Sequence, residues 1–270
     1  MCPQEQGGHV SKRVLIFDSG VGGLSVYQEI RRVLPGLHYI YLFDNKCFPY
    51  GELPVETLIQ RCCELIVGVA THHAVDLVVI ACNTASTQAL PALRALLSVP
   101  VVGVVPAIKP ASLLTKNGCI GLLATPATIS RPYTDKLIHE FAAHHQVLRC
   151  GSTELVIQAE RKLAGQSVDQ PLIDAILEPW RQAERVPDTL VLGCTHFPLL
   201  KEEIWAAMPG VQLVDSGSAV ARRVQNVLGR VGADAGEGSW AYCTRLDTNA
   251  LSLLPILQAQ GLNHLIEWSN

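Results

Sequence analysis

Val78-Val79-Ile80-Ala81-Cys82-Asn83-Thr84 decides the fold, because a short apolar, mostly β-branched run stops there at a cysteine and two hydrogen-bonding side chains. Such a run predicts a buried β-strand. Leu190-Val191-Leu192-Gly193-Cys194-Thr195-His196 has the same pattern. Both runs are continuously apolar rather than alternating, which indicates parallel sheets covered by helices on both faces.

Similar apolar runs alternate with helical patterns along the chain, which predicts an α/β protein with mainly parallel sheets. We expect strands at 13–18, 38–43, 76–82, 101–105, 119–124, 146–150, 189–194 and 211–215. We expect helices near 24–34, 55–72, 85–97, 129–143, 154–164, 172–183, 201–207 and 219–228.

Two boundaries divide the chain into two domains. Pro106 and Pro110 bracket a short segment after the fourth strand, and a return boundary falls near 215–217. We therefore expect a discontinuous first domain, 1–104 plus 216–270, and a second domain, 105–215.

A second repeated string, Asp-Ser-Gly, occurs at 18–20 and 215–217, so that each half would have one strand-end cysteine and one such turn. The order differs, since Asp18 precedes Cys82 whereas Asp215 follows Cys194, and simple tandem duplication does not explain that. Pseudo-twofold symmetry and functional convergence of strand ends both remain open.

Composition limits the class of protein. The 270 residues are 49% hydrophobic and 17% charged, which favours a well-filled core. The 21 basic and 24 acidic residues give a net charge of −3, and no basic block stands out. A nucleic-acid footprint is therefore not expected, and the pattern favours a small-molecule substrate.

Neither a membrane segment nor an export signal is expected. The longest strongly apolar charge-free stretch, 95–108, contains two prolines and is shorter than the ~18 residues of a membrane span. The first twelve residues are polar, which is typical of a frayed tail and not of a secretory signal. We expect a cytoplasmic protein whose nine cysteines are reduced thiols. No Cys-x-x-Cys occurs, and no metal site is expected.

Cys82 and Cys194 differ from the other cysteines because each falls where a strand ends and a helix begins, the edge at which α/β sheets bind ligands. A helix N-terminus lowers the pKa of a thiol. Asn83, Thr84 and Thr195 could cap these helices and offer hydrogen bonds to a ligand. Capping alone would explain one such string, but two matched strings favour a site. His196 could help to deprotonate Cys194.

The glycine-rich string at 18–23 closes the first strand, and its backbone could hold an anion. It lacks the third glycine of the dinucleotide fingerprint, although Asp44 could serve as a ribose-binding acid, so a nicotinamide site is a weaker alternative. A simple turn is the plainest alternative. Phe48-Pro49-Tyr50-Gly51 is a loop typical of a turn or of a site margin.

Four ordered motifs together carry a resemblance that spans residues 14 to about 257. The chain resembles the cofactor-independent glutamate racemases, with the related aspartate racemases as a more distant match. The motifs are Phe17-Asp18-Ser19-Gly20-Val21-Gly22-Gly23-Leu24, Phe48-Pro49-Tyr50-Gly51, Ala81-Cys82-Asn83-Thr84-Ala85-Ser86 and Leu192-Gly193-Cys194-Thr195-His196-Phe197-Pro198-Leu199.

The resemblance implies two flavodoxin-like α/β domains that enclose a buried amino-acid site. It implies that this site interconverts L- and D-glutamate without a cofactor, and that the D-glutamate is used to make peptidoglycan. It implies Cys82 and Cys194 as the two acid/bases. By looser matching, Glu160 corresponds to an acidic residue near the second cysteine. The substrate-lining residues implied are Asp18, Ser19, Tyr50, Gly51, Asn83, Thr84, Thr195 and His196. The family also raises the prospect of a homodimer and of activation by a cell-wall precursor.

The residues suit this chemistry, because inverting an α-carbon needs a base on one face and an acid on the other. Asp18 beside Cys82 and His196 beside Cys194 could set the two protonation states. Two other classes compete with a racemase. One is a non-catalytic nucleotide- or anion-binding module that uses Ser19 and the glycines; the other is a thiol redox protein.

Overall fold

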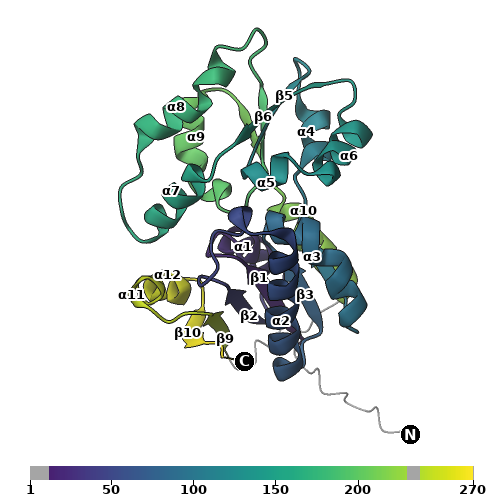
Figure 1. The fold of residues 1–270 in the computed structure, drawn as a ribbon, viewed down its shortest axis with the longest axis vertical. Helices are drawn as coiled ribbons and strands as arrows, with labels where there is room; N and C mark the ends of the chain where they lie inside the picture. The colour runs from purple at the N-terminus through teal and green to yellow at the C-terminus, as the bar shows by residue number, and fades with distance from the viewer. Residues whose placement is uncertain (1–11, 230–237, 270) are drawn as a thin grey trace, which may run out of the picture.

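The structure consists of two halves stacked end to end, and it describes residues 12–229 and 238–269 of the chain (Figure 1). This is a computed structural model. Cys2 and the rest of the expected N-terminal tail up to Ser11 lie outside the described residues. The eight cysteines in the described part are all free thiols. Both described ends of the chain belong to the same half (Figure 1).

The first half is built around a six-stranded parallel sheet of order β10-β9-β2-β1-β3-β4. Its strands are β1 (Arg13–Asp18), β2 (His38–Phe43), β3 (Leu77–Ile80), β4 (Val101–Gly103), β9 (Ser239–Cys243) and β10 (Leu262–Glu267).

The second half is built around a four-stranded parallel sheet of order β6-β5-β7-β8. Its strands are β5 (Cys119–Ala124), β6 (Gln146–Gly151), β7 (Thr189–Leu192) and β8 (Gln212–Val214). The predicted α/β class with parallel sheets is therefore confirmed, and so are the eight predicted strands. The sequence did not predict β9 and β10.

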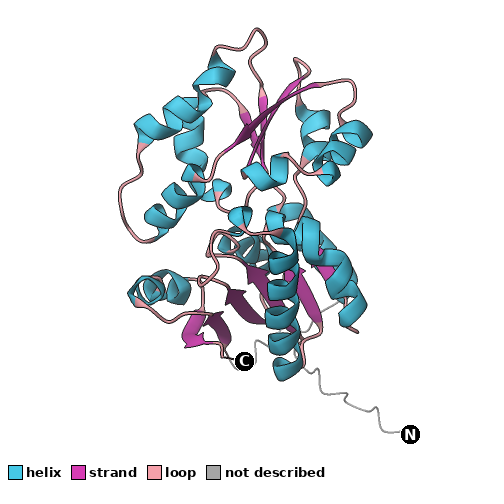
Figure 2. Ribbon diagram, viewed as in Figure 1, coloured by secondary structure: helices cyan, strands magenta, loops and turns pink. Residues whose placement is uncertain are grey.

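Helices cover both faces of each sheet (Figure 2). Those of the first half are α1 (Leu24–Val33), η1 (Tyr50–Glu52), α2 (Val55–His73), α3 (Asn83–Leu96), α10 (Gly217–Leu228), α11 (Thr248–Ser252) and α12 (Leu254–Ala259). Those of the second half are α4 (Ile108–Leu114), α5 (Pro126–Ile129), α6 (Pro132–Phe141), α7 (Glu154–Leu163), α8 (Gln170–Arg181), η2 (Phe197–Leu200) and α9 (Lys201–Ala207). Within the described ranges, no helix combines the length and the apolar character that a membrane crossing needs.

Each sheet has a separate apolar core on either face, as the strand period of two requires. In β1, Val14 and Ile16 pack with α1 and α10 residues on one face, whereas Leu15 and Phe17 pack with α2 and α3 residues on the other. The second sheet is divided in the same way. Two-sided burial explains why the strands are continuously apolar in sequence.

The four strands β2-β1-β3-β4 correspond in order to β6-β5-β7-β8, which gives the two halves their pseudo-twofold relation. In this correspondence β3 matches β7, so Cys82 and Cys194 take equivalent places, each two residues beyond its strand.

The Asp-Ser-Gly strings do not correspond, because Asp18 ends β1 whereas Asp215 follows β8, whose partner in the first sheet is β4. The two Asp-Ser-Gly strings thus lie at the ends of strands in different sheets, but those strands are not equivalent. The true counterpart of β1 is β5, and the chain continues from β5 into Thr125-Pro126 instead.

The chain crosses between the sheets twice, after β4 and after β8 (Figure 1). The Ser216 hydroxyl donates to the Val105 carbonyl at 2.5 Å, which ties one crossing to the other. Asp215 accepts a hydrogen bond from the Gly217 amide at 2.8 Å and pairs with Lys201 at 2.6 Å. The domain boundaries proposed from sequence, near 104–110 and 215–217, fall at these two crossings.

Candidate active site

A small cavity lies where the two halves meet, and both strand-end cysteines line it. Nine of the predicted residues form part of its wall. They are Ser19, Tyr50, Gly51, Cys82, Asn83, Thr84, Cys194, Thr195 and His196, with Phe48, Pro49, Thr125, Thr153 and Val156 completing the wall. Asp18 and Glu160 join this group through hydrogen bonds to residues of the wall. The structure thus brings all the predicted site residues together.

Cys82 is itself the N-cap of α3, because its sulfur accepts a hydrogen bond from the Ala85 amide at 3.4 Å. Asn83 and Thr84 are the first two residues of the helix, so the expectation that they cap it was wrong. The Ser19 hydroxyl lies 3.5 Å from the same sulfur. The Nδ2 atom of Asn83 is buried without a partner among the described residues. An unpaired buried donor of this kind is suited to bind a ligand.

Burial raises the pKa of the Cys82 thiol to about 12; the negative charge of Asp18 adds to this rise, and the Ala85 and Ser19 hydrogen bonds oppose it more weakly. The expected depression of this pKa by the helix N-terminus is therefore wrong for Cys82. A buried thiol loses the solvation of its charged form, and this cost exceeds the effect of the helix dipole. In the absence of ligand, Cys82 keeps its proton.

Cys194 has a different neighbour, a histidine that a carboxylate holds in place. The Cys194 sulfur lies 3.8 Å from Nδ1 of His196, and Nε2 of His196 lies 2.7 Å from Glu160 Oε1. Burial alone lowers the pKa of His196, but the hydrogen bonds and charges of Cys194 and Glu160 outweigh it and hold that pKa well above its usual value. A protonated His196 can donate toward the Cys194 sulfur on one side and toward the Glu160 carboxylate on the other.

Asp18 joins the two halves beneath the cavity. Its carboxylate accepts hydrogen bonds from the Gly20 amide at 2.8 Å and from the Thr195 hydroxyl at 2.9 Å. The side chain is fully buried, and burial raises its pKa despite the opposing effects of His196 and these two donors. Two further hydrogen bonds cross between the halves close by, from the Val21 amide to Glu160 at 3.1 Å and from the Ser25 hydroxyl to the Thr195 carbonyl at 2.9 Å.

The glycines of the first loop make room for the other half of the molecule. A Cβ atom at Gly22 would clash with the ring of His196, and one at Gly20 would lie 2.7 Å from Glu160 Oε1. No side chain fits so close to these groups. The glycine pattern that suggested an anion cradle therefore has a second physical reason, the close approach of His196 and Glu160.

The nicotinamide alternative fails at Asp44. This carboxylate is buried, and Arg61, Tyr50 and Thr244 already donate hydrogen bonds to it. A ribose hydroxyl would have to displace one of these donors.

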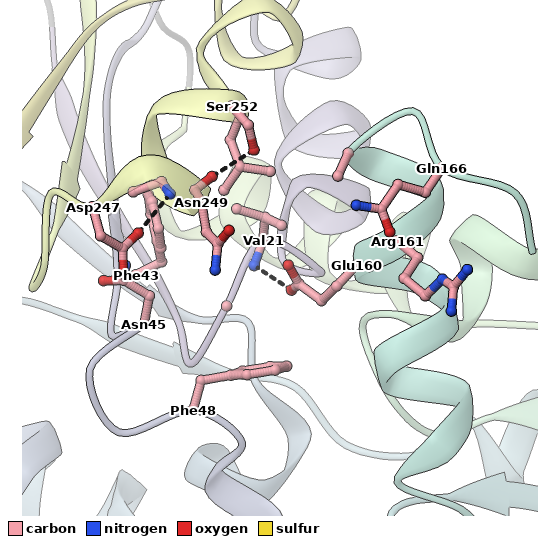
Figure 3. A pocket seen from close by; sticks show the side chains of 14 residues that line it. Val21, Phe43, Asn45, Phe48, Glu160, Arg161, Gln166, Asp247, Asn249 and Ser252 are labelled. Carbon is pink, nitrogen blue, oxygen red and sulfur yellow. Dashed lines mark hydrogen bonds between the residues drawn. The ribbon is translucent and has the colours of Figure 1, made fainter.

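A larger groove of about 320 Å³ lies outside the cavity, on the other side of Phe48 and Gly20. Figure 3 shows Glu160 reaching from α7 toward the Val21 amide, with Phe48 below them. The ring of Phe48 also packs against His196 at 5.7 Å between centroids. Phe48 lines both spaces, so it forms part of the partition between them.

The sequence profile of the Asp/Glu/Hydantoin racemase family matches residues 14–224 of the chain. The chain belongs to this racemase family. A glutamate racemase of Pectobacterium carotovorum is 53% identical over 255 residues, covering 93% of this chain and 90% of the relative. The structure of this chain has the same fold as Escherichia coli glutamate racemase, which was solved in complex with L-glutamate and the activator UDP-MurNAc-Ala. That structure has a TM-score of 0.93 and 49% identity, covering 96% of this chain and 99% of the other.

A glutamate racemase isoform from Bacillus anthracis has a TM-score of 0.82 at 29% identity, covering 97% of this chain and 98% of the other. The family resemblance inferred from the four motifs is thus confirmed, and the protein is an isomerase of the amino-acid racemase class.

Sequence reasoning missed three residues of the racemase cavity, namely Thr125, Thr153 and Val156. Thr125 follows β5 as Ser19 follows β1, so the pseudo-symmetry was the signal that could have found it. Its hydroxyl lies 3.2 Å from that of Thr84 and 3.0 Å from that of Thr128. In the described residues, no three His, Cys, Asp or Glu side chains gather as a metal site would require.

Proposed function

We propose that this chain interconverts L- and D-glutamate, with Cys82 and Cys194 acting on opposite faces of the α-carbon. The observation that carries the proposal is the presence of both thiols in one small cavity, each at the end of an equivalent strand. The names of relatives at about half identity over nearly the whole chain support the substrate.

The proton balance follows from the two environments. In one direction, Cys194 as a thiolate removes the α-proton and becomes a thiol, while the Cys82 thiol gives its proton to the other face and becomes a thiolate. The reverse direction exchanges these roles. Hydrogen-bond donors in the cavity wall, among them Asn83, Thr84 and Thr195, would stabilise the charge that develops on the substrate carboxylate.

Asp18 and Ser19 would receive the substrate ammonium beside Cys82. Bringing a positive charge to the buried Asp18 offsets the cost of its burial and makes a thiolate at Cys82 less costly. His196, positioned by Glu160, would stabilise the thiolate form of Cys194. Tyr50 and Gly51 would complete the wall around the remainder of the substrate.

The cavity must open to admit glutamate. Its free space is about 20 Å³, whereas one water already needs about 10–15 Å³ by this measure. The walls come from both halves, and at least five hydrogen bonds cross between the halves near the cavity among the described residues. We infer that the halves separate for binding and release, and that closure excludes water around the reacting carbon.

The decisive experiment is incubation of the purified protein with L-glutamate in deuterated water without added cofactor. The expected result is D-glutamate that carries deuterium at the α-carbon, measured by chiral chromatography with mass spectrometry. Absence of both the D-isomer and the label would refute the proposed function.

Three further features are proposed with this activity. The D-glutamate formed would be used for peptidoglycan, and a strain depleted of this protein should then need external D-glutamate for growth. A UDP-linked muramoyl-alanine, the activator of the Escherichia coli structure, would raise kcat/KM. A homodimer would give twice the chain mass in light scattering.

A further inference from the structure

Asp44 is a buried carboxylate outside the proton-transfer machinery, and donors occupy both of its oxygens. Arg61 donates from Nε at 2.9 Å and from Nη2 at 3.1 Å. The Tyr50 hydroxyl donates at 2.7 Å and the Thr244 hydroxyl at 2.5 Å. These hydrogen bonds join the end of β2, α2, the segment after β9 and the turn η1.

The charges of this cluster are strongly coupled. Burial raises the pKa of Asp44, but the donors, Arg61 first among them, outweigh burial and hold that pKa below its usual value. Hydrogen bonding to Asp44 raises the pKa of Arg61. The Asp44 side chain is 0% exposed and that of Arg61 is 23% exposed. Removing one partner of such a pair leaves a buried charge without its counterion, which costs far more than losing a surface ion pair.

The cluster reaches the cavity through Tyr50. Tyr50 lines the cavity that contains Cys82, and its hydroxyl donates to Asp44. The ring also packs on Phe17, with centroids 6.1 Å apart. Gly51 follows directly and faces Thr125, since a Cβ atom there would lie 3.5 Å from Thr125 Cβ. Neither Tyr50 nor Gly51 is therefore free to exchange a proton with the substrate.

We propose that Arg61, acting through Asp44, is a positioning residue that holds the Tyr50–Gly51 wall in place for substrate binding. This inference rests on the proposed function. The wall has no acid or base available for catalysis, so its displacement weakens binding of substrate and transition state alike. Such a loss raises KM and leaves kcat nearly unchanged.

The test compares Arg61→Met with a matched control, Arg32→Met. Arg32 also pairs with a carboxylate in the first half, Glu29 at 3.0 Å, but its side chain is 68% exposed. We expect Arg61→Met to raise KM for both enantiomers about tenfold, a change of about 1.4 kcal/mol in binding, with kcat within about twofold. Arg32→Met should leave both parameters as in the wild type.

Two more variants separate positioning from general loss of structure. Arg61→Lys keeps the charge but loses the paired donors, and its KM should lie between those of the wild type and Arg61→Met. Tyr50→Phe should raise KM on its own, and Arg61→Met should add little in the Tyr50→Phe background, because both act through the same contact. These two variants carry the test should Arg61→Met not fold.

The proposal is overturned if Arg61→Met lowers the melting temperature but leaves KM unchanged, or if kcat falls while KM does not. Additive effects of Tyr50→Phe and Arg61→Met would overturn it as well. A wild-type protein that does not racemise glutamate would instead refute the proposed function, and the two failures are therefore distinguishable.

Discussion

Cys82 and Cys194 occupy equivalent places in the two sheets, but the groups beside them carry opposite charge. Cys82 has the Asp18 carboxylate nearby, linked through the Ser19 hydroxyl, and its thiol stays protonated. Cys194 has the His196 ring, which Glu160 keeps in its charged form. The backbone repeat supplies two matched sulfurs, and the side chains beside the two sulfurs differ in charge.

A two-base racemase needs this difference before the first turnover, because two thiols or two thiolates cannot both remove and return a proton. Equivalent strand ends alone would not supply it. The asymmetry arises from Asp18 beside Cys82 and from His196 and Glu160 beside Cys194, and each can be changed separately.

Removing either sulfur should have the largest effect. Cys82→Ser and Cys194→Ser replace a thiol with a hydroxyl that does not ionise near neutral pH, so we expect kcat to fall by about 10²–10⁴-fold in both directions. Chiral assay of both reactions measures this. Cys63→Ser, a change of a half-buried cysteine on α2, is the control. Near-normal turnover in either active-site variant would contradict the two-base assignment.

Glu160→Gln should lower the pKa of His196, the histidine beside Cys194. His196 is charged below its pKa, and losing the Glu160 carboxylate lowers that pKa, so the charged form is lost at a lower pH. The basic limb of kcat/KM should shift to lower pH, with about tenfold less activity at about pH 8. Glu154→Gln on the same helix is the control. An unchanged basic limb would show that Glu160 does not set the charge of His196.

Asp18→Asn removes the carboxylate charge beside Cys82 and should make the Cys82 thiol easier to ionise. Without the like charge, the pKa of Cys82 should fall. The pH dependence of iodoacetamide labelling, measured in the Cys194→Ser background, reports this midpoint. A midpoint that does not move would leave burial as the sole cause of the raised pKa.

Ser25→Ala should have the smallest effect, because it removes a hydrogen bond between the halves and not a group of the cavity wall. The Ser25 hydroxyl proton is shared between the Thr195 carbonyl at 2.9 Å and the Gly22 carbonyl at 2.8 Å, and losing both contacts should cost about 1 kcal/mol of unfolding free energy. Urea denaturation measures it. Ser112→Ala, which removes an exposed hydroxyl bonded to the Lys109 carbonyl, should cost less. Equal costs for the two variants would mean that the Ser25 contact adds nothing to the closed arrangement.

The sequence predicted β1 to β5 and β7 because burial makes each a short apolar run with little ambiguity. It also predicted β6 and β8, although both strands are only partly buried. It missed β9 and β10, which lie at the edge of the sheet. β10 exposes Asn263, His264 and Glu267, so it lacks the pattern of a buried strand. Its place depends on pairing with β9, a tertiary contact that local composition does not report.

The site residues could be predicted where chemistry and strand ends coincide, as at both cysteines. Their protonation could not, because helix position suggested a lowered pKa for Cys82 and burial beside Asp18 reverses it. The place of the second Asp-Ser-Gly turn in the sheet could not be predicted either. Asp215 makes the same hydrogen bond to the residue two positions on as Asp18 does, but local geometry does not say which strand it follows in the sheet.

The pairing of β2 with β9, which brings Ile40 beside Trp240, has a consequence for biosynthesis. The four strands of the second sheet are contiguous, between Cys119 and Val214, so a ribosome delivers them all before β9 emerges. Closing so long a loop is also slow for a free chain. We expect the half made second to finish folding first, while the half that starts the chain waits for the last strands to complete its sheet.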